Sequence, residues 1–360
     1  MTADPAIKDR LTRAADLVPV DVGSHLGHLY SDRRTRVVRQ RIGVFVVAAV
    51  VALLAVVVIW RLLPLGTANV PAAPAEPSGT LAVMRGTLAG SDGVHFAAVA
   101  FPLTPSAPAT TLARTAGLPT WPPDGSKLAY VVGPNHHVNL VVADGDGAHP
   151  RRIATDLPTF GFAWSPDGSS IAVRTLTEHG AARVSVIDVA TGVVRDLPAL
   201  DGDWWNLAWS PDGTRFAFAG PAGLWVQNLD GSHRQTLVSD LHVVNPDWSP
   251  DGSMLAFGCR APDDASDYRY DICAVHADGS RFVRFDDWVG WDAVPVWSPD
   301  GRWLAFASDR GATPAQIAQN PGGARLEGVT VYLMRPDGSD VRRLVPASVR
   351  FELVPTDWRA

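Results

Sequence analysis

The sequence is organised around a five-residue phrase, Trp-Ser-Pro-Asp-Gly, with one Trp-Pro-Pro-Asp-Gly variant. The five copies stand at Trp121–Gly125, Trp164–Gly168, Trp209–Gly213, Trp248–Gly252 and Trp297–Gly301. A sixth copy begins at Asp357-Trp358, and the successive tryptophans are 43, 45, 39, 49 and 61 residues apart. Self-similarity at this period indicates one repeated supersecondary unit, and about 40–50 residues suits a four-stranded propeller blade.

Each phrase predicts a tight turn between two strands. Proline presets φ at the second turn position, aspartate tolerates the third, and glycine takes the left-handed conformation at the end. Apolar runs such as Phe160–Trp164 and Ile171–Val173 flank the turn, which is typical of a hairpin. A second hairpin, such as the one around Val226–Gly231, completes four strands per repeat. A lone sheet would leave both faces in water, so the blades must stack, with the tryptophan as the wedge between them.

These repeats resemble the WD40-like PD40 propeller repeat found in the C-terminal domain of TolB, and the resemblance covers residues 79–360. It implies a β-propeller and favours protein binding. TolB carries a further domain before its propeller, whereas residues 1–78 here are of a different kind. The resemblance therefore does not carry over TolB's role in envelope integrity or its partners, because one fold hosts many activities.

The ends of the chain are expected to complete one blade together. Trp358 can supply only a first strand, while Gly79–Val83 copies the second-strand pattern of the repeats. Val94–Phe101 and Thr110–Arg114 can supply the remaining two strands. Such closure removes exposed sheet edges. The sequence thus predicts an all-β, six-bladed propeller over residues 79–360, closed by pairing of its N- and C-terminal strands and preceded by a single transmembrane helix.

Ahead of the propeller, the sequence predicts a membrane anchor. Residues 42–60 carry no charge, and as a helix they would span about 28 Å, enough to cross a hydrocarbon core. Five arginines lie between Arg33 and Arg41 and one, Arg61, follows the span. This bias puts the tail, residues 1–41, in the cytoplasm and the propeller outside, with membrane lipid around residues 42–60. A cleaved signal peptide is the alternative, although both leader and apolar core are long for one. Residues 61–78, rich in proline and alanine, form a linker.

Cys259 and Cys273 are the only cysteines of the chain. They fall in the second and third strands of the fourth full repeat, where antiparallel pairing would bring them roughly opposite each other. Outside the cytoplasm such a pair is expected to form a disulfide, with two buried thiols as the alternative.

The most variable part of each repeat predicts the binding face. Loops between second and third strands differ in length, and they share one rim with the loops that enter each first strand. Insertions confined to one rim often mark the binding face. Aromatic and acidic residues in the entering loops suit a peptide, a sugar or a cationic group. The predicted ligand-binding residues are Phe160, Trp204, Trp205, His242, Trp288, Trp291, Phe351, Asp203, Asp287 and Asp292, with packing between blades as the alternative role of the tryptophans.

Other chemistry finds little support in the sequence. There is no Gly-x-Ser-x-Gly elbow, no His-Glu-x-x-His and no phosphate-binding glycine loop, and we predict no cofactor. His136-His137 lacks a third metal ligand at fixed spacing, and the acidic loop Asp263–Asp271 is expected to be solvated. A net charge of −6 argues against a nucleic-acid partner.

Three functions remain open. The first is a membrane-anchored scaffold that binds an envelope protein, peptide or glycan. The second is an extracytoplasmic hydrolase, lactonase- or glycosidase-like, with carboxylates from three or more blades in its channel. The third is a ligand sensor that signals through its cytoplasmic tail.

Overall fold

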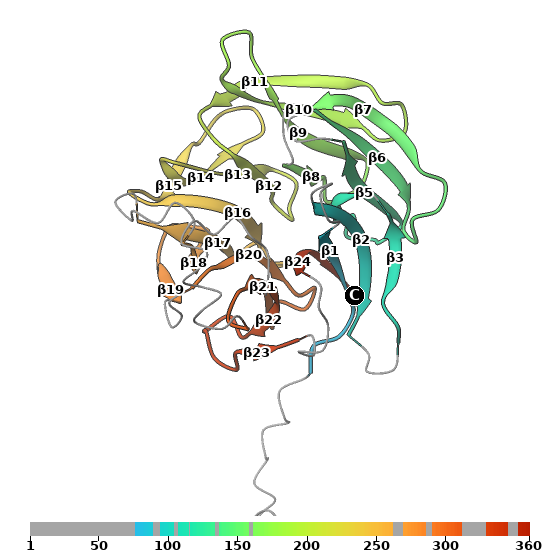
Figure 1. Ribbon diagram of the computed structural model, residues 1–360. Helices are drawn as coiled ribbons and strands as arrows, with labels where there is room; N and C mark the ends of the chain where they lie inside the picture. The colour runs from blue at the N-terminus through green and yellow to red at the C-terminus, as the bar shows by residue number, and fades with distance from the viewer. Residues whose placement is uncertain are drawn as a thin grey trace, which may run out of the picture. The chain divides into compact units, whose positions relative to one another are not determined.

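The computed structural model describes residues 76–88, 94–103, 107–114, 116–133, 137–157, 161–261, 269–285, 290–311, 329–344 and 352–360. Their strands form six four-stranded antiparallel sheets, arranged as blades around a central axis (Figure 1). The six-bladed, all-β propeller is thereby confirmed. The described residues contain no helix long and apolar enough to cross a membrane. The predicted span 42–60 and tail 1–41 lie outside the described residues.

The blades follow one another along the chain, and we number them from the one that holds both ends of the propeller. Blade 1 consists of β24 (Glu352–Arg359), β1 (Thr80–Leu88), β2 (Val94–Pro102) and β3 (Thr110–Ala113). Blade 2 consists of β4 (Gly117–Thr120), β5 (Lys127–Val132), β6 (Val138–Asp144) and β7 (Arg151–Leu157). Blade 3 consists of β8 (Phe162–Trp164), β9 (Ser170–Leu176), β10 (Ala182–Asp188) and β11 (Val194–Gly202).

The other three blades repeat this plan without a break in the order of strands. Blade 4 consists of β12 (Asn206–Trp209), β13 (Arg215–Gly220), β14 (Gly223–Asn228) and β15 (Gln235–Val238). Blade 5 consists of β16 (His242–Trp248), β17 (Met254–Arg260), β18 (Asp271–His276) and β19 (Val283–Phe285). Blade 6 consists of β20 (Asp292–Trp297), β21 (Leu304–Ser308), β22 (Thr330–Met334) and β23 (Arg342–Arg343). The first strand of each blade faces the channel, and the last lies at the periphery (Figure 1).

The ring closes where the two ends of the propeller meet. β24 pairs with β1, and Trp358 stands opposite Leu81 in the register. The buried indole of Trp358 packs against Leu81 and Trp303, and its Nε1 donates to the carbonyl of Ser78 at 2.8 Å. The predicted closure is therefore present, and each sheet has a neighbour on both faces.

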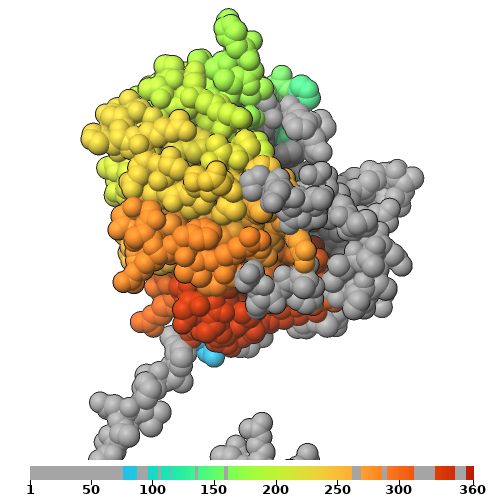
Figure 2. Space-filling view, turned by 90° about the vertical axis from the view of Figure 1, so that its left-hand side faces the viewer, coloured from blue at the N-terminus to red at the C-terminus, as the bar shows by residue number. Residues whose placement is uncertain are grey.

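The core of the molecule lies between blades. Six clusters of buried apolar side chains each join two consecutive blades. Every repeat tryptophan belongs to the cluster between its own blade and the preceding one, as Trp164 does with Val142 of blade 2. The aromatic wedge predicted from the repeat is thus the element that seals successive sheets. Figure 2 shows blades 3 to 6 side by side in chain order.

The Ser-Pro-Asp-Gly turns collect at one end of the ring, which we call the turn rim. In blade 3, Asp167 Oδ1 accepts from the Ser165 hydroxyl at 2.5 Å and from the Ser169 N–H at 3.0 Å, while Gly168 has a φ of 68°. Each turn also touches the next one, because a proline lies against the glycine of the following blade. These contacts are Pro122 with Gly168, Pro166 with Gly213, Pro211 with Gly252 and Pro250 with Gly301. The opposite end, where the first strands begin, is called the loop rim.

Candidate functional site

The loop rim carries the residues that the sequence predicts to bind a ligand. Six of the ten are described: Asp203, Trp204, Trp205, His242, Trp291 and Asp292. The other four, Phe160, Asp287, Trp288 and Phe351, lie outside the described residues. The six fall into two groups, because some face solvent and others are packed into the protein.

Trp205 and His242 come together across the boundary between blades 4 and 5. Their ring centroids are 5.8 Å apart at an interplanar angle of 81°, an edge-to-face contact. Trp205 keeps 36% of its surface exposed, and His242 is half-buried. Asp203 and Asp240, each two residues before one of these rings, are exposed. We call Asp203, Trp205, Asp240 and His242 the loop-rim patch.

Trp204, in contrast, is part of the hydrophobic core. It is only 1% exposed, packs at 5.1 Å from the ring of Phe218, and donates from Nε1 to the carbonyl of Leu200 at 3.3 Å. Arg174 donates to the Trp204 carbonyl at 3.0 Å. The two adjacent indoles of this loop therefore have opposite environments, Trp204 buried and Trp205 exposed. Trp204 is therefore not available to a ligand at the rim.

Blade 6 buries its two described candidates more deeply than the sequence suggests. Asp292 is 1% exposed and forms a 2.6 Å ion pair with Arg310. Trp291 is half-buried in a small cluster with Val354, and its N–H donates to Asp309 Oδ1 at 2.9 Å. The ion pair keeps Asp292 inside the protein, since a buried carboxylate needs a partner. Among the described residues, the candidates that remain accessible to a ligand are therefore those of blades 4 and 5.

A different pair of acids lies along the central channel, nearer the turn rim. Asp247 Oδ2 accepts from the backbone N–H of Trp297 at 2.8 Å, and Asp357 Oδ2 accepts from that of Trp121 at 2.5 Å. The Trp297 N–H belongs to the first strand β20 and the Trp121 N–H directly follows the first strand β4, and the inner edges of these strands have no neighbouring strand. Each carboxylate thus satisfies a free edge and joins its own blade to the next.

A bulge directs Asp247 across to blade 6. The register of β16 shifts between Val244 and Asp247, and Asn245, which precedes Pro246, has a φ of 49°. Bulges re-aim side chains in this way. This role was not predicted from the sequence, although the sequence contains a signal for it. Only two repeats place aspartate before the tryptophan, at Asp247-Trp248 and Asp357-Trp358.

Both channel carboxylates hold protons more tightly than free aspartate does. Burial raises the pKa of Asp247 to about 7, with a further rise from the charge of Asp357, against the lowering effect of the hydrogen bond from Trp297. Burial likewise raises the pKa of Asp357 to about 6. As whole residues, Asp247 and Asp357 are half-buried. Raised carboxyl pKa values in a channel suit proton transfer, but here the same oxygens hold the blades together.

The remaining sequence predictions concern the cysteines and metal ligands. Cys259 and Cys273 form a disulfide between β17 and β18, as predicted, with Cα atoms 5.9 Å apart. His137 pairs with Asp156 at 2.5 Å, and Asp271 pairs with Arg284; His136, Asp263, Asp264 and Asp267 lie outside the described residues. Within the described ranges, no three His, Cys, Asp or Glu side chains are grouped to hold a metal ion.

Comparison with known proteins agrees with this architecture. A family model described as the TolB beta propeller domain, PD40, matches residues 208–335. An uncharacterized protein of Agrobacterium fabrum is 27% identical over 235 residues, which cover 63% of this chain and 74% of that protein. The Tol-Pal system protein TolB of Methylococcus capsulatus is 38% identical over 85 residues, covering 21% of this chain but only 20% of that TolB.

A solved structure extends the likeness to most of the ring. The crystal structure of TolB from Acinetobacter baumannii superposes with a TM-score of 0.59 at 18% identity, over 80% of this chain and 68% of that one. At this identity the likeness concerns the fold alone. The six-sheet ring, the repeated turns and the matching family model together show a six-bladed β-propeller whose repeats are similar to the PD40 repeats of TolB.

Proposed function

We propose that the propeller is a binding module that recognises a protein or peptide of the cell envelope through its loop rim. The observation that carries the proposal is the exposed indole of Trp205 set against His242, with the exposed carboxylates of Asp203 and Asp240 beside them. Tryptophan is enriched among residues that dominate binding energy, and acids around it select a basic or polar partner. The matching TolB proteins are named as members of a Tol-Pal system, which supports a protein partner.

We propose further that residues 42–60 anchor the protein in the membrane, with the tail 1–41 inside and the propeller outside. The uncharged span and the arginines before it support this arrangement. The disulfide of Cys259 and Cys273 supports it as well, because disulfides persist outside the cytoplasm. Alkaline extraction should leave the full-length chain in the membrane fraction, and deletion of residues 42–60 should release it. Release of the intact chain would refute the anchor.

The described part of the propeller begins at the end of the ring opposite the loop-rim patch. The first described residues lie at the turn rim, where Glu76 pairs with Arg342 at 2.5 Å and Ser78 accepts from the Trp358 indole. In Figure 2 they are seen, in blue, below blade 6. The loop-rim patch lies at the other end of the ring.

The residues of the described channel favour a binding protein over a hydrolase. A propeller hydrolase would bring carboxylates from three or more blades to one point, as the sequence hypothesis requires. In the described channel, Asp247 and Asp357 supply carboxylates from two blades, and each accepts a hydrogen bond that ties two blades together. The corresponding positions before the other tryptophans are Thr120, Ala163, Ala208 and Val296.

A photo-crosslinking experiment tests the recognition surface. A crosslinking amino acid placed at Trp205 of the full-length chain should capture an envelope protein in living cells. The same residue at Val194, an exposed apolar position on the outer strand β11, is the matched control. The capture should disappear in a His242→Ala, Asp203→Asn background. Equal products from both positions, or none at Trp205, would refute the loop rim as the binding surface.

A further inference from the structure

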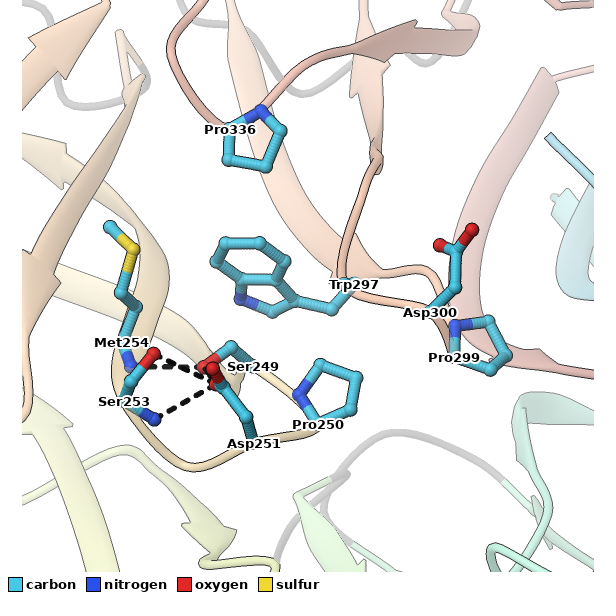
Figure 3. Close-up of a pocket in the computed structure, with 10 residues that line it drawn as sticks. Ser249, Pro250, Asp251, Ser253, Met254, Trp297, Pro299, Asp300 and Pro336 are labelled. Atoms are coloured by element: carbon cyan, nitrogen blue, oxygen red, sulfur yellow. Dashed lines mark hydrogen bonds between the residues drawn. The ribbon is translucent and has the colours of Figure 1, made fainter. Parts of the chain in front are cut away.

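A pocket opens on the turn rim, at the end of the ring opposite the loop-rim patch. It lies between blades 5 and 6 and has a volume of about 450 Å³. The turn after β16 forms one side, and the turns after β20 and β22 form the other (Figure 3). Its apolar lining includes Pro250, Pro299, Pro336, Met254 and the indole of Trp297. The pocket is therefore a groove between stacked turns with an aromatic ring inside it.

The indole nitrogen of Trp297 sets this pocket apart. Trp297 is 5% exposed, and its Nε1 is buried without a hydrogen-bond partner in the described part of the chain. The other repeat indoles all donate: Trp121 to Gly145 O, Trp164 to Thr120 O, Trp209 to Gly213 O, Trp248 to Ala208 O and Trp358 to Ser78 O. An unpaired buried N–H is costly and rare, so this donor calls for an acceptor that the described residues do not provide.

The surroundings of the nitrogen define which acceptor can reach it. In Figure 3 the nitrogen lies on the side of the indole that faces Met254 and Ser249. Met254 is half-buried and has three rotatable bonds, so it can swing aside to admit an oxygen atom. The three prolines offer rigid apolar surface to a neighbouring side chain. An extended peptide presents both a carbonyl oxygen and such a side chain.

Two carboxylates give the pocket its charge. Asp251 Oδ1 accepts from the Ser249 hydroxyl at 2.6 Å and from the Ser253 N–H at 3.0 Å. Asp300 Oδ1 accepts from the Ser298 hydroxyl at 2.6 Å. The bond from Ser249 is the main reason that the pKa of Asp251 lies below the usual range, so this group is ionised at neutral pH. Both acids are exposed, and the Oδ2 atom of each has no hydrogen-bond partner among the described residues.

We propose that this turn-rim pocket binds a basic peptide segment of a partner protein. A backbone carbonyl of the peptide accepts from Trp297 Nε1, an apolar side chain lies against Pro250 and Pro336, and an arginine or lysine pairs with Asp251 and Asp300. The site is separate from the loop-rim patch and does not depend on the function proposed for it. The propeller would then carry a binding site at each end of the ring.

Indole N–H signals of the ¹⁵N-labelled full-length chain, in mild detergent, test this proposal directly. The Trp297 signal is identified by its loss in Trp297→Phe, or by its selective shift in Met254→Ala should the first variant fail to fold. Acetyl-Leu-Arg-amide should move the Trp297 signal downfield and leave that of Trp248, the equivalent indole between blades 4 and 5, in place. Replacing arginine by its neutral isostere citrulline should weaken binding about fivefold, as expected for an exposed ion pair.

Matched variants separate this site from non-specific attraction. Asp251→Asn with Asp300→Asn should weaken binding of the arginine probe about fivefold, whereas Asp212→Asn, in the corresponding turn of blade 4, should leave it unchanged. A Trp297 signal that stays fixed up to the solubility limit of the probe would overturn the proposal. Equal binding of the arginine and citrulline probes would overturn it as well, as would rapid exchange of the Trp297 N–H with water without any response to the probe.

Discussion

The two rims of the propeller differ in how regular their structure is from blade to blade. At the turn rim, each Ser-Pro-Asp-Gly turn repeats the same hydrogen bonds, and each of four prolines touches the next glycine. At the loop rim, Trp204 is buried, Trp205 is exposed and Trp291 is half-buried. At the turn rim, the structure of each turn is determined by five consecutive residues. At the loop rim, the burial of each side chain depends on which residues of neighbouring loops pack against it.

The largest difference between the rims should appear when one tryptophan from each is removed. Trp358→Ala should lower the free energy of unfolding by about 3–5 kcal/mol, because it empties a buried site at the ring closure. Trp205→Ala, at an exposed site, should change it by less than about 0.5 kcal/mol. Chemical denaturation of both variants gives the comparison. Equal losses would mean that Trp205 is as structural as Trp358.

The disulfide should be the next largest contribution, and it strengthens the side of blade 5 that leads to the loop rim. It closes a loop over a sequence separation of 14. In the chain-entropy model, its loss in Cys259→Ala, Cys273→Ala should cost about 3 kcal/mol. Denaturation of the double variant against the oxidised parent measures this effect. An unchanged midpoint would show that β17 and β18 are held by their ladder alone.

The channel aspartates and the turn aspartates should affect the pH dependence of stability differently. Because folding raises the pKa of Asp247 to about 7, its contribution to stability is complete below the ordinary aspartate pKa and is lost as pH rises through about 7. Stability should therefore fall between pH 5 and pH 8, by on the order of 2 kcal/mol for this group. Asp247→Asn keeps an acceptor for the Trp297 N–H and should remove most of that fall, leaving the part contributed by Asp357, whose pKa burial raises to about 6.

The turn aspartates serve as a control, because their pKa values are lowered on folding rather than raised. Hydrogen bonds, the first from the Ser165 hydroxyl, lower the pKa of Asp167, so its contribution is present above the ordinary value and is lost only as pH drops through the lowered one. Asp167→Asn should therefore leave the slope between pH 5 and pH 8 unchanged. Thermal unfolding across this range compares the two variants. A parent protein with no slope would show that Asp247 titrates normally.

Much of the fold was predictable because its signals are local and repeated. The turn phrase, the flanking apolar runs and the spacing of tryptophans specify hairpins, blades and their number. The pairing of Leu81 with Trp358 followed from matching an incomplete last repeat to an incomplete first one. The partnership of Cys259 with Cys273 followed from their positions on adjacent strands.

The candidate site was predictable only in part. Trp205 and His242 lie in edge-to-face contact. Asp292 instead forms a buried ion pair with Arg310, a pairing that has no signature in the sequence. The channel role of Asp247 depends on a bulge at Asn245 and on a free N–H in the next blade. The contact between Asp247 and Trp297 joins residues 50 positions apart, so no local pattern contains it.

The sequence by itself determined a closed ring of six blades, because turn chemistry and tryptophan wedges act within each repeat and between consecutive ones. Only the tertiary structure decided which loop residues reach solvent, which acids satisfy the channel edges, and that the Trp297 indole lacks a hydrogen-bond partner among the described residues. The reason is that burial and hydrogen bonding are properties of the space between blades. That space is shaped by side chains from both neighbours at once.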